Sequence, residues 1–498
     1  MYRNQYFMVA GLSSPDREFA GMAPISLMDF SIYQGPHLNL SFTKYESVEI
    51  LLLGYVIDPL NPERSDQEVI ENLARTCKTQ NSFFEGIQIL SGRFVLVYRN
   101  ESSFIALGDA CSFKQMYFGQ LDDFFVMTSS EAMFLNYFDL SLQMSSLKQQ
   151  HVADPNYKKH EQAWFGDKGF DDRLFKVLPN HYLDLKAKEV KRIPYFSPKG
   201  NLSEDDIINF ASSVLKGTFA ALINRGLTLK LALTAGLDSR VLLAASKDFK
   251  DKIEYFRFNH KVDAPDTIIP SRLAQTLGLN YEGLTPKSLN DTFLAEYKQE
   301  HIIPPILTKT THIQHYYYHW QDRNYISING GANAVAKTCF GIMKGKVSLD
   351  MLVCFSNYAT DNEFVRSELK AWLEDAADYS ESSGVPLLDL FYWEQRLGNW
   401  GADQPFQKDI AIEEICPCNN RSLIAHLLLI NPSKRLTPNY EFFRKLIQSM
   451  WPEVLTEPIN PGKKWPGEKR FKSILKRNSA LNFAAKTAIY KTKKVFQS

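Results

Sequence analysis

The stretch that decides the fold is Leu231-Ala232-Leu233-Thr234-Ala235-Gly236-Leu237-Asp238-Ser239-Arg240. It begins inside an apolar run at 229–233, passes through a tight turn of small residues and enters a second apolar run, 241–245, at helical spacing. A strand, a small-residue turn and a helix start form an anion site, because unpaired backbone N–H groups and the helix dipole point at the turn. Small residues let a phosphate approach the backbone closely. The stretch therefore predicts a phosphate-binding loop at 234–239.

Three side chains of this 234–239 loop suit a nucleotide. Thr234 and Ser239 offer hydroxyl groups to phosphate oxygens, and the Asp238 carboxylate can hold Mg²⁺. The loop is not of the Walker type, since no Gly-Lys-Ser or Gly-Lys-Thr follows it. An ordinary strand-to-helix turn in a doubly wound sheet is the alternative interpretation.

The composition is that of a globular protein with a nearly neutral net charge. The chain has 498 residues, enough for two or three domains, of which 44% are hydrophobic and 23% charged. A net charge of +1 argues against nucleic acid as a partner. The first residues carry no secretory signal pattern, and no apolar stretch is as long as a membrane span. The six scattered cysteines indicate reduced thiols, so we expect a cytoplasmic protein without an integral membrane segment.

The distribution of apolar runs predicts two domains, 1–197 and 198–498. The first is rich in predicted strands, at 6–9, 48–57, 93–98, 104–107 and 124–128, with one helix at 66–77. After a break near Pro198, predicted strands at 228–233, 254–258 and 325–328 alternate with helices at 237–246, 265–277 and 311–322. This alternation predicts a parallel sheet covered on both faces. Beyond Ser348 the chain is expected to be mainly helical.

Further segments of the second domain follow the loop in a characteristic order. They are Ala264-Pro265-Asp266 with its following helix, Asn329-Gly330-Gly331-Ala332-Asn333-Ala334, Glu413-Glu414-Ile415-Cys416-Pro417-Cys418-Asn419-Asn420-Arg421, and Trp451-Pro452-Glu453 with Pro461-Gly462-Lys463-Lys464. Together with the loop, they resemble the synthetase domain of the asparagine synthetase family. The resemblance implies a doubly wound parallel sheet of the PP-loop type (adenine nucleotide alpha hydrolase-like), with extra helices.

Other segments, in the first domain, carry a second resemblance. They are Ser91-Gly92-Arg93-Phe94, Leu107-Gly108-Asp109, Ser129-Ser130-Glu131-Ala132 and Val177-Leu178-Pro179-Asn180-His181-Tyr182. They are similar to the class II glutamine amidotransferase domain of the same family, which implies an Ntn-type αββα sandwich. The family's N-terminal cysteine is missing, since Tyr2 follows Met1, and its Asn-Gly oxyanion turn aligns with Leu53-Gly54. We therefore expect a degenerate domain without glutaminase activity.

The resemblance implies a site in which the loop grips the pyrophosphate half of ATP while a substrate carboxylate attacks the α-phosphorus. The residues expected to bind ATP and its pyrophosphate are Leu233, Thr234, Ala235, Gly236, Leu237, Asp238, Ser239, Phe258, Gly330 and Gly331. The implied cofactors are ATP and Mg²⁺, with Asp238 as the metal ligand, because Ala334 stands where the family has a second metal-binding Asp. Lys463 and Lys464 match the segment whose lysine reaches the α-phosphate or pyrophosphate, and they are the expected catalytic residues.

Two other features allow more than one interpretation. His312, His315 and His319 fall on one helical face, where they bind a metal or, as we favour, line a pocket and pack against the sheet. The basic tail, 463–494, mixes cations with apolar residues and favours a solvated amphipathic helix over contact with a membrane or nucleic acid.

The sequence therefore predicts an asparagine synthetase-like, ATP-dependent C–N ligase that adenylates a carboxylate and forms an amide. Without glutaminase, the nitrogen comes from free ammonia or from a substrate amine, as in the related β-lactam synthetases and lasso-peptide cyclases. The expected partners are a small-molecule or peptide carboxylate substrate, the nitrogen nucleophile, and a second copy of the chain or a biosynthetic partner protein. The alternatives are a non-catalytic nucleotide-binding or scaffold protein, and a natural-product or surface-polysaccharide tailoring enzyme of the same family.

Overall fold

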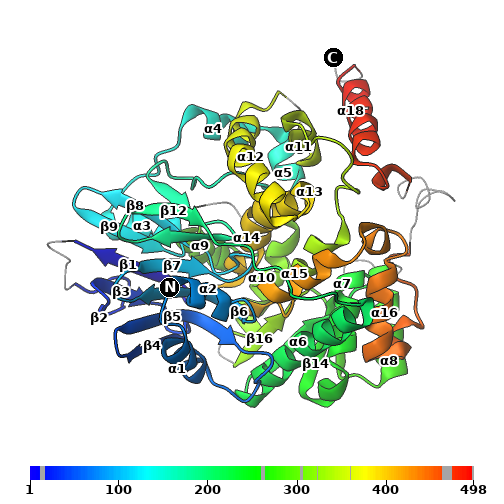
Figure 1. Cartoon of the computed structure of the whole chain (residues 1–498), viewed down its shortest axis with the longest axis horizontal. Helices are drawn as coiled ribbons and strands as arrows, with labels where there is room; N and C mark the ends of the chain where they lie inside the picture. The colour runs from blue at the N-terminus through cyan, green and yellow to red at the C-terminus, as the bar shows by residue number, and fades with distance from the viewer. Residues whose placement is uncertain are drawn as a thin grey trace.

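The computed structural model describes residues 1–11, 17–259, 264–302, 307–321, 324–358, 361–461 and 474–495. In these residues the chain is a mixed α/β protein with two antiparallel sheets and one parallel sheet. The antiparallel sheets lie at the left of Figure 1, and helices that surround the parallel sheet lie at its lower right.

Both antiparallel sheets have six strands. The first has the order β10 (Leu174–Lys176), β8 (Tyr117–Leu121), β9 (Phe124–Thr128), β1 (Tyr6–Ala10), β3 (Phe30–Gln34) and β2 (Ile25–Leu27). The second has the order β12 (Glu189–Arg192), β11 (His181–Asp184), β7 (Phe104–Gly108), β6 (Ser91–Arg99), β5 (Val48–Ile57) and β4 (Leu40–Tyr45). The five strands predicted from apolar runs in this half of the chain are all present.

Alternation of apolar side chains along β5 explains how these sheets pack. Leu51 points to one side, into a core shared with Met8 and Ile32 of the first sheet. Leu52, the next residue, points to the other side, into a core that includes covering helices. The helices are α1 (Asp66–Thr76) and α2 (Gln80–Gly86) on this face, and α3 (Glu131–Phe138) on the outer face of the first sheet. The layers are thus helix, sheet, sheet and helix.

A long apolar helix, α6 (Glu204–Asn224), follows the sandwich. Among the described residues it is the one helix whose length and composition would suffice to cross a membrane. The sequence analysis expected no apolar stretch of that length. Its buried residues Val214 and Phe219 lie in one core with Leu229 and Leu231 of the parallel sheet, which is the position of a core helix. The proposed domain boundary at 197 and 198 lies between β12 and α6 and stays a prediction.

The parallel sheet has five strands and a reversal in its strand order. The order is β15 (Tyr281–Leu284), β14 (Ile253–Phe258), β13 (Thr228–Ala232), β16 (Tyr325–Ile328) and β17 (Glu413–Ile415). Successive strands run outward from β13 to β15, and the chain then returns to the other side of β13 with β16. Such a switch point leaves a crevice at the carboxyl ends of the two central strands, where open α/β sheets bind ligands.

Helices make up most of the rest of the second half. Between the strands lie α7 (Leu237–Ala245), η1 (Lys247–Lys252), α8 (Pro265–Leu277), α9 (Asp291–Glu300), α10 (Leu307–His319) and η2 (Gly331–Lys337). After Ser348 come α11 (Leu349–Phe355), α12 (Glu363–Ser383), α13 (Leu387–Phe391), the π-helix η3 (Tyr392–Gly401), α14 (Ala402–Lys408), α15 (Arg421–Leu429), η4 (Pro432–Arg435), α16 (Glu441–Met450), η5 (Pro452–Leu455) and α18 (Ser479–Val495). Two short helices of the first half, α4 (Ser146–Ala153) and α5 (Pro155–Lys159), lie near α11 and α12 in Figure 1. The expectation of a mainly helical region after 348 is confirmed.

Buried charges join the sandwich to the second half of the chain. Arg93 on β6 donates to the two carboxylate oxygens of Asp409, at 2.5 and 2.7 Å, and to Glu413 at 2.7 Å. Lys114 adds a second cation, with its Nζ 3.2 Å from a Glu413 oxygen. All four side chains are at most 5% exposed. We call Arg93, Lys114, Asp409 and Glu413 the buried charge cluster.

Candidate functional site

The 234–239 loop is held in shape by its own side chains. The Thr234 and Ser239 hydroxyl oxygens are 2.7 Å apart, and the backbone N–H of Gly236 donates to Thr234 Oγ1 at 3.0 Å. Gly236 is the N-cap of α7 and no side chain caps that helix. The first N–H groups of α7 are therefore available to an anion, as the sequence pattern predicts.

The loop lies at the switch point of the parallel sheet. It follows β13, and the turn after β16 comes so close that a Cβ added to Gly330 would lie 2.9 Å from Asp238 Cβ. From the other side, the Ala235 N–H donates to Asp266 Oδ1 at 2.9 Å, and the Asn460 N–H donates to the Ala235 carbonyl at 2.8 Å. The structure thus brings Gly330 to the loop, as the resemblance implies.

Other predicted nucleotide residues are placed differently. The side chains of Leu233 and Leu237 are 1% and 2% exposed and belong to the core, so these residues can offer a ligand only their backbone. Phe258 ends β14, is buried, and stacks on His312 with ring centroids 4.0 Å apart. Lys463 and Lys464, the predicted catalytic pair, lie outside the described residues.

Asp238, the predicted metal ligand, is bound by a lysine. Lys337, the last residue of η2, places its Nζ 2.6 Å from Asp238 Oδ2. Burial opposes the charged form of Lys337, but the Asp238 carboxylate outweighs it and holds the pKa of Lys337 above its ordinary value. Asp238 Oδ1 is buried and has no hydrogen-bond partner. The lysine gave no signal in the sequence, because a lysine in a short turn ordinarily lies in solvent.

The residues around Asp238 do not fit a divalent cation well. The side chains of Ala334 and Val335 bring no oxygen, and one carboxylate oxygen of Asp238 is already bonded to Lys337. Mg²⁺ requires close to octahedral oxygen coordination and usually one or two carboxylates. Within the described ranges, no group of three or more His, Cys, Asp or Glu side chains could hold a metal ion. The metal role of Asp238 therefore stays a prediction that its contacts do not support.

A cavity of about 310 Å³ lies next to the loop, at the carboxyl ends of β16 and β17. Its polar lining includes Arg257, Lys309, His312, Asn329, Lys408 and Glu414. Glu414 accepts hydrogen bonds from Lys408 Nζ and from Asn329 Nδ2, both at 2.5 Å. Asn329 and Gly331 flank Gly330, so the cavity borders the turn that packs against Asp238. The sequence reading named none of these cations, because their elements are distant along the chain.

Two of the three histidines of α10 pack as we favoured, since His312 stacks on Phe258 of β14 and His315 meets the same ring edge-on, whereas His319 is exposed. His312 lines this cavity, while the rings of His315 and His319 lie 4.6 Å apart. Burial lowers the pKa of His315 to about 4, so it is neutral at physiological pH.

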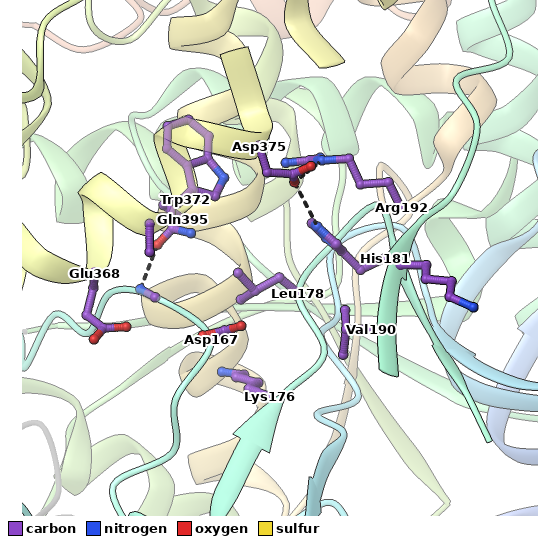
Figure 2. A pocket seen from close by; sticks show the side chains of 13 residues that line it. Asp167, Lys176, Leu178, His181, Val190, Arg192, Glu368, Trp372, Asp375 and Gln395 are labelled. Atoms are coloured by element: carbon purple, nitrogen blue, oxygen red, sulfur yellow. Dashed lines mark hydrogen bonds and ion pairs between the residues drawn. The ribbon is translucent and has the colours of Figure 1, made fainter. Parts of the chain in front are cut away.

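A second cavity, of about 420 Å³, lies between the edge of the second antiparallel sheet and α12 (Figure 2). Its charged groups are mostly paired with one another. Asp375 accepts from Arg192 and lies 3.9 Å from His181 Nε2, while Glu368 binds Lys168 at 2.8 Å. No predicted nucleotide residue lines it, and its ion pairs leave little free charge for a ligand.

The residues at the expected, degenerate glutaminase site are buried and make their contacts within the protein. Tyr2 is fully buried, and its backbone N–H donates to Glu300 Oε1 at 2.6 Å. Leu53 is fully buried inside β5. Asp109 accepts from the backbone N–H groups of Cys111, Phe113 and Lys114 and from the Asn419 amide, so it holds a loop rather than a substrate.

We expect the purified protein to release no glutamate from glutamine above a protein-free blank. Tyr2 supplies no nucleophile, and Leu53 supplies no side-chain donor for an oxyanion. The Tyr2→Cys variant should stay inactive too, because it restores the thiol but not the oxyanion donor. Glutamate release by the wild-type protein would contradict this expectation.

Comparisons with protein-family models and with curated proteins found no match. Among solved structures, the chain is similar to glutamine phosphoribosylpyrophosphate amidotransferase from B. subtilis complexed with ADP and GMP, at 9% identity and a TM-score of 0.24. The match covers 67% of this chain and 71% of that one. A structure described as the allosteric regulatory enzyme of purine biosynthesis matches at 9% identity and a TM-score of 0.24, over 66% of this chain and 68% of that one.

Proposed function

We propose that the protein is an ATP-dependent ligase that adenylates a carboxylate and then forms an amide with ammonia or a substrate amine. The observation that carries the proposal is the position of the 234–239 loop. Its hydroxyl groups and free helix N–H groups lie at the switch point of a parallel sheet, beside the Gly330 turn. This combination supports binding of the pyrophosphate half of ATP there.

The adjoining 310 Å³ cavity supports a carboxylate as the second substrate. Arg257 and Lys309 line its wall. Lys309 Nζ lies 3.6 Å from Glu161 and Arg257 lies 3.8 Å from Asp266, and each cation keeps further N–H donors that can bind a carboxylate oxygen. A carboxylate held there could attack the α-phosphorus of ATP, releasing pyrophosphate and leaving an acyl adenylate. An amine would then attack the acyl carbon, form the amide and release AMP. With no glutaminase in the proposal, the amine comes from solution or from the substrate.

Exchange of labelled pyrophosphate into ATP tests this proposal. We expect exchange that depends on one member of a carboxylate panel and falls by about tenfold or more in Ser239→Ala, since the loop loses its hydroxyl pair. The matched control is Ser246→Ala, at the other end of α7, where the buried hydroxyl bonds Tyr255 at 2.8 Å. Equal exchange in wild type and Ser239→Ala would contradict the site.

A non-catalytic nucleotide-binding protein is the second candidate. Two observations favour it: Lys337 binds Asp238, and Ala334 lacks a carboxylate. The same experiment separates the two functions. ATP binding by calorimetry without exchange for any carboxylate would favour the second candidate.

A further inference from the structure

Lys337 occupies the position beside Asp238 at which a phosphate-bound cation would act. Its side chain is 15% exposed, and its single hydrogen bond in the described contacts goes to Asp238 Oδ2. An ammonium has three N–H donors, so two remain. η2, which carries Lys337, starts at Gly331, directly after the Gly330 turn that contacts Asp238. The Gly330 turn and η2, which follow each other at the switch point, therefore hold the Lys337 ammonium beside the 234–239 loop.

A divalent ion bound to Asp238 would meet this fixed charge. Oδ1 is the one Asp238 oxygen without a partner, and it belongs to the carboxylate that already neutralises Lys337. An ion there would stand close to an ammonium with no second carboxylate from Ala334 or Val335 to offset the repulsion. The Asp238 carboxylate can neutralise one cation, and the Lys337 ammonium already is that cation.

We propose that the Lys337 ammonium takes the place of a protein-bound divalent ion and binds the phosphate oxygens of ATP directly. This inference rests on the proposed nucleotide site. Asp238 is then a positioning residue, which accepts one N–H of Lys337 and directs the others toward the 234–239 loop. Nucleotide affinity should depend on Lys337 and only weakly on Mg²⁺.

Calorimetric titration of the protein with ATP, in Mg²⁺ and in EDTA, tests the proposal. We expect wild-type affinities within about threefold of each other in the two buffers, and a loss of about tenfold or more in Lys337→Met in both. Asp238→Asn, whose amide oxygen can still accept from Lys337, should lose less than Lys337→Met. The control is Lys230→Met, on β13, which removes another ion-paired lysine and should leave affinity unchanged.

Two outcomes would overturn the inference. One is ATP binding by the wild-type protein that requires Mg²⁺. This result overturns the inference even if Lys337→Met does not fold. The other is a Mg²⁺-dependent affinity lost in Asp238→Asn and kept in Lys337→Met, which would make Asp238 a metal ligand. Failure of the wild type to bind ATP in either buffer is distinguishable, because it overturns the proposed function itself and this inference with it.

Discussion

Arg93→Met is expected to lower the free energy of unfolding by about 3–5 kcal/mol, the usual cost of breaking a buried ion pair from one side. Arg93 is 1% exposed and is the main partner of two carboxylates, those of Asp409 and Glu413. Without it, Lys114 alone faces two buried negative charges, with its Nζ 4.0 Å from Asp409 and 3.2 Å from Glu413. Urea denaturation of the two proteins measures the difference.

The control for this prediction lies on the same strand. Arg99, also on β6, pairs with Asp29 and Glu49, but its side chain is 28% exposed and that of Asp29 is 78% exposed. Arg99→Met should therefore cost about 1 kcal/mol or less, because water screens such pairs. Equal losses in the two variants would mean that the cost comes from removing any arginine of β6, and that the buried charge cluster has no special role.

The pH dependence of the Arg93→Met variant gives a second check. Burial raises the pKa of Asp409 and Arg93 opposes this, so removing Arg93 raises the folded-state pKa further above the unfolded value. A carboxyl group whose pKa is higher in the folded than in the unfolded protein lowers the free energy of unfolding at any pH above its unfolded-state pKa. This loss grows as the pH rises toward the folded-state pKa. The deficit of Arg93→Met should therefore shrink as the pH is lowered toward about 4, the ordinary pKa of an Asp carboxyl.

The apolar periodicity of the sequence was enough to predict strands that bury apolar side chains. It was not enough for a strand whose buried side chains are charged and neutralised by ion pairs. The predicted strand 48–57 coincides with β5, because its apolar residues from Ile50 to Leu53 alternate between two apolar cores. β17 was missed, since its three residues include Glu413 and Glu414, which look like surface residues. They are buried because Arg93 and Lys408 neutralise them, and those partners come from other elements.

The candidate site, too, could be predicted from the sequence only in part. The 234–239 loop could be found from sequence because strand, turn and helix start are contiguous, and its approach to Gly330 follows from parallel neighbours in a sheet. The contact between Lys337 and Asp238 could not, since residues 99 positions apart meet only through the path of η2. The cations of the 310 Å³ cavity likewise come from β14, α10 and α14.

Gly330→Ala is expected to lower ATP–pyrophosphate exchange by about 100-fold, the scale of loss when reacting groups move by about 1 Å. The new methyl carbon would lie 2.9 Å from Asp238 Cβ and 3.2 Å from the Asp238 carbonyl oxygen, so the first turn of α7 has to shift. Gly330 has φ −112°, which alanine adopts without strain, so the effect is steric. Calorimetry should show weaker ATP binding in a variant that remains folded.

Gly331→Ala places the same methyl group one residue later and separates packing from ligand contact. Its nearest neighbour would be Asn329 Oδ1 at 3.4 Å, an ordinary contact, so exchange should stay within about threefold of the wild type. Equal losses in both variants would mean that the nucleotide lies directly on this turn and that added bulk, not displacement of α7, blocks it. Full exchange in Gly330→Ala would mean that the position of the 234–239 loop does not control the reaction, and the site would have to be sought elsewhere.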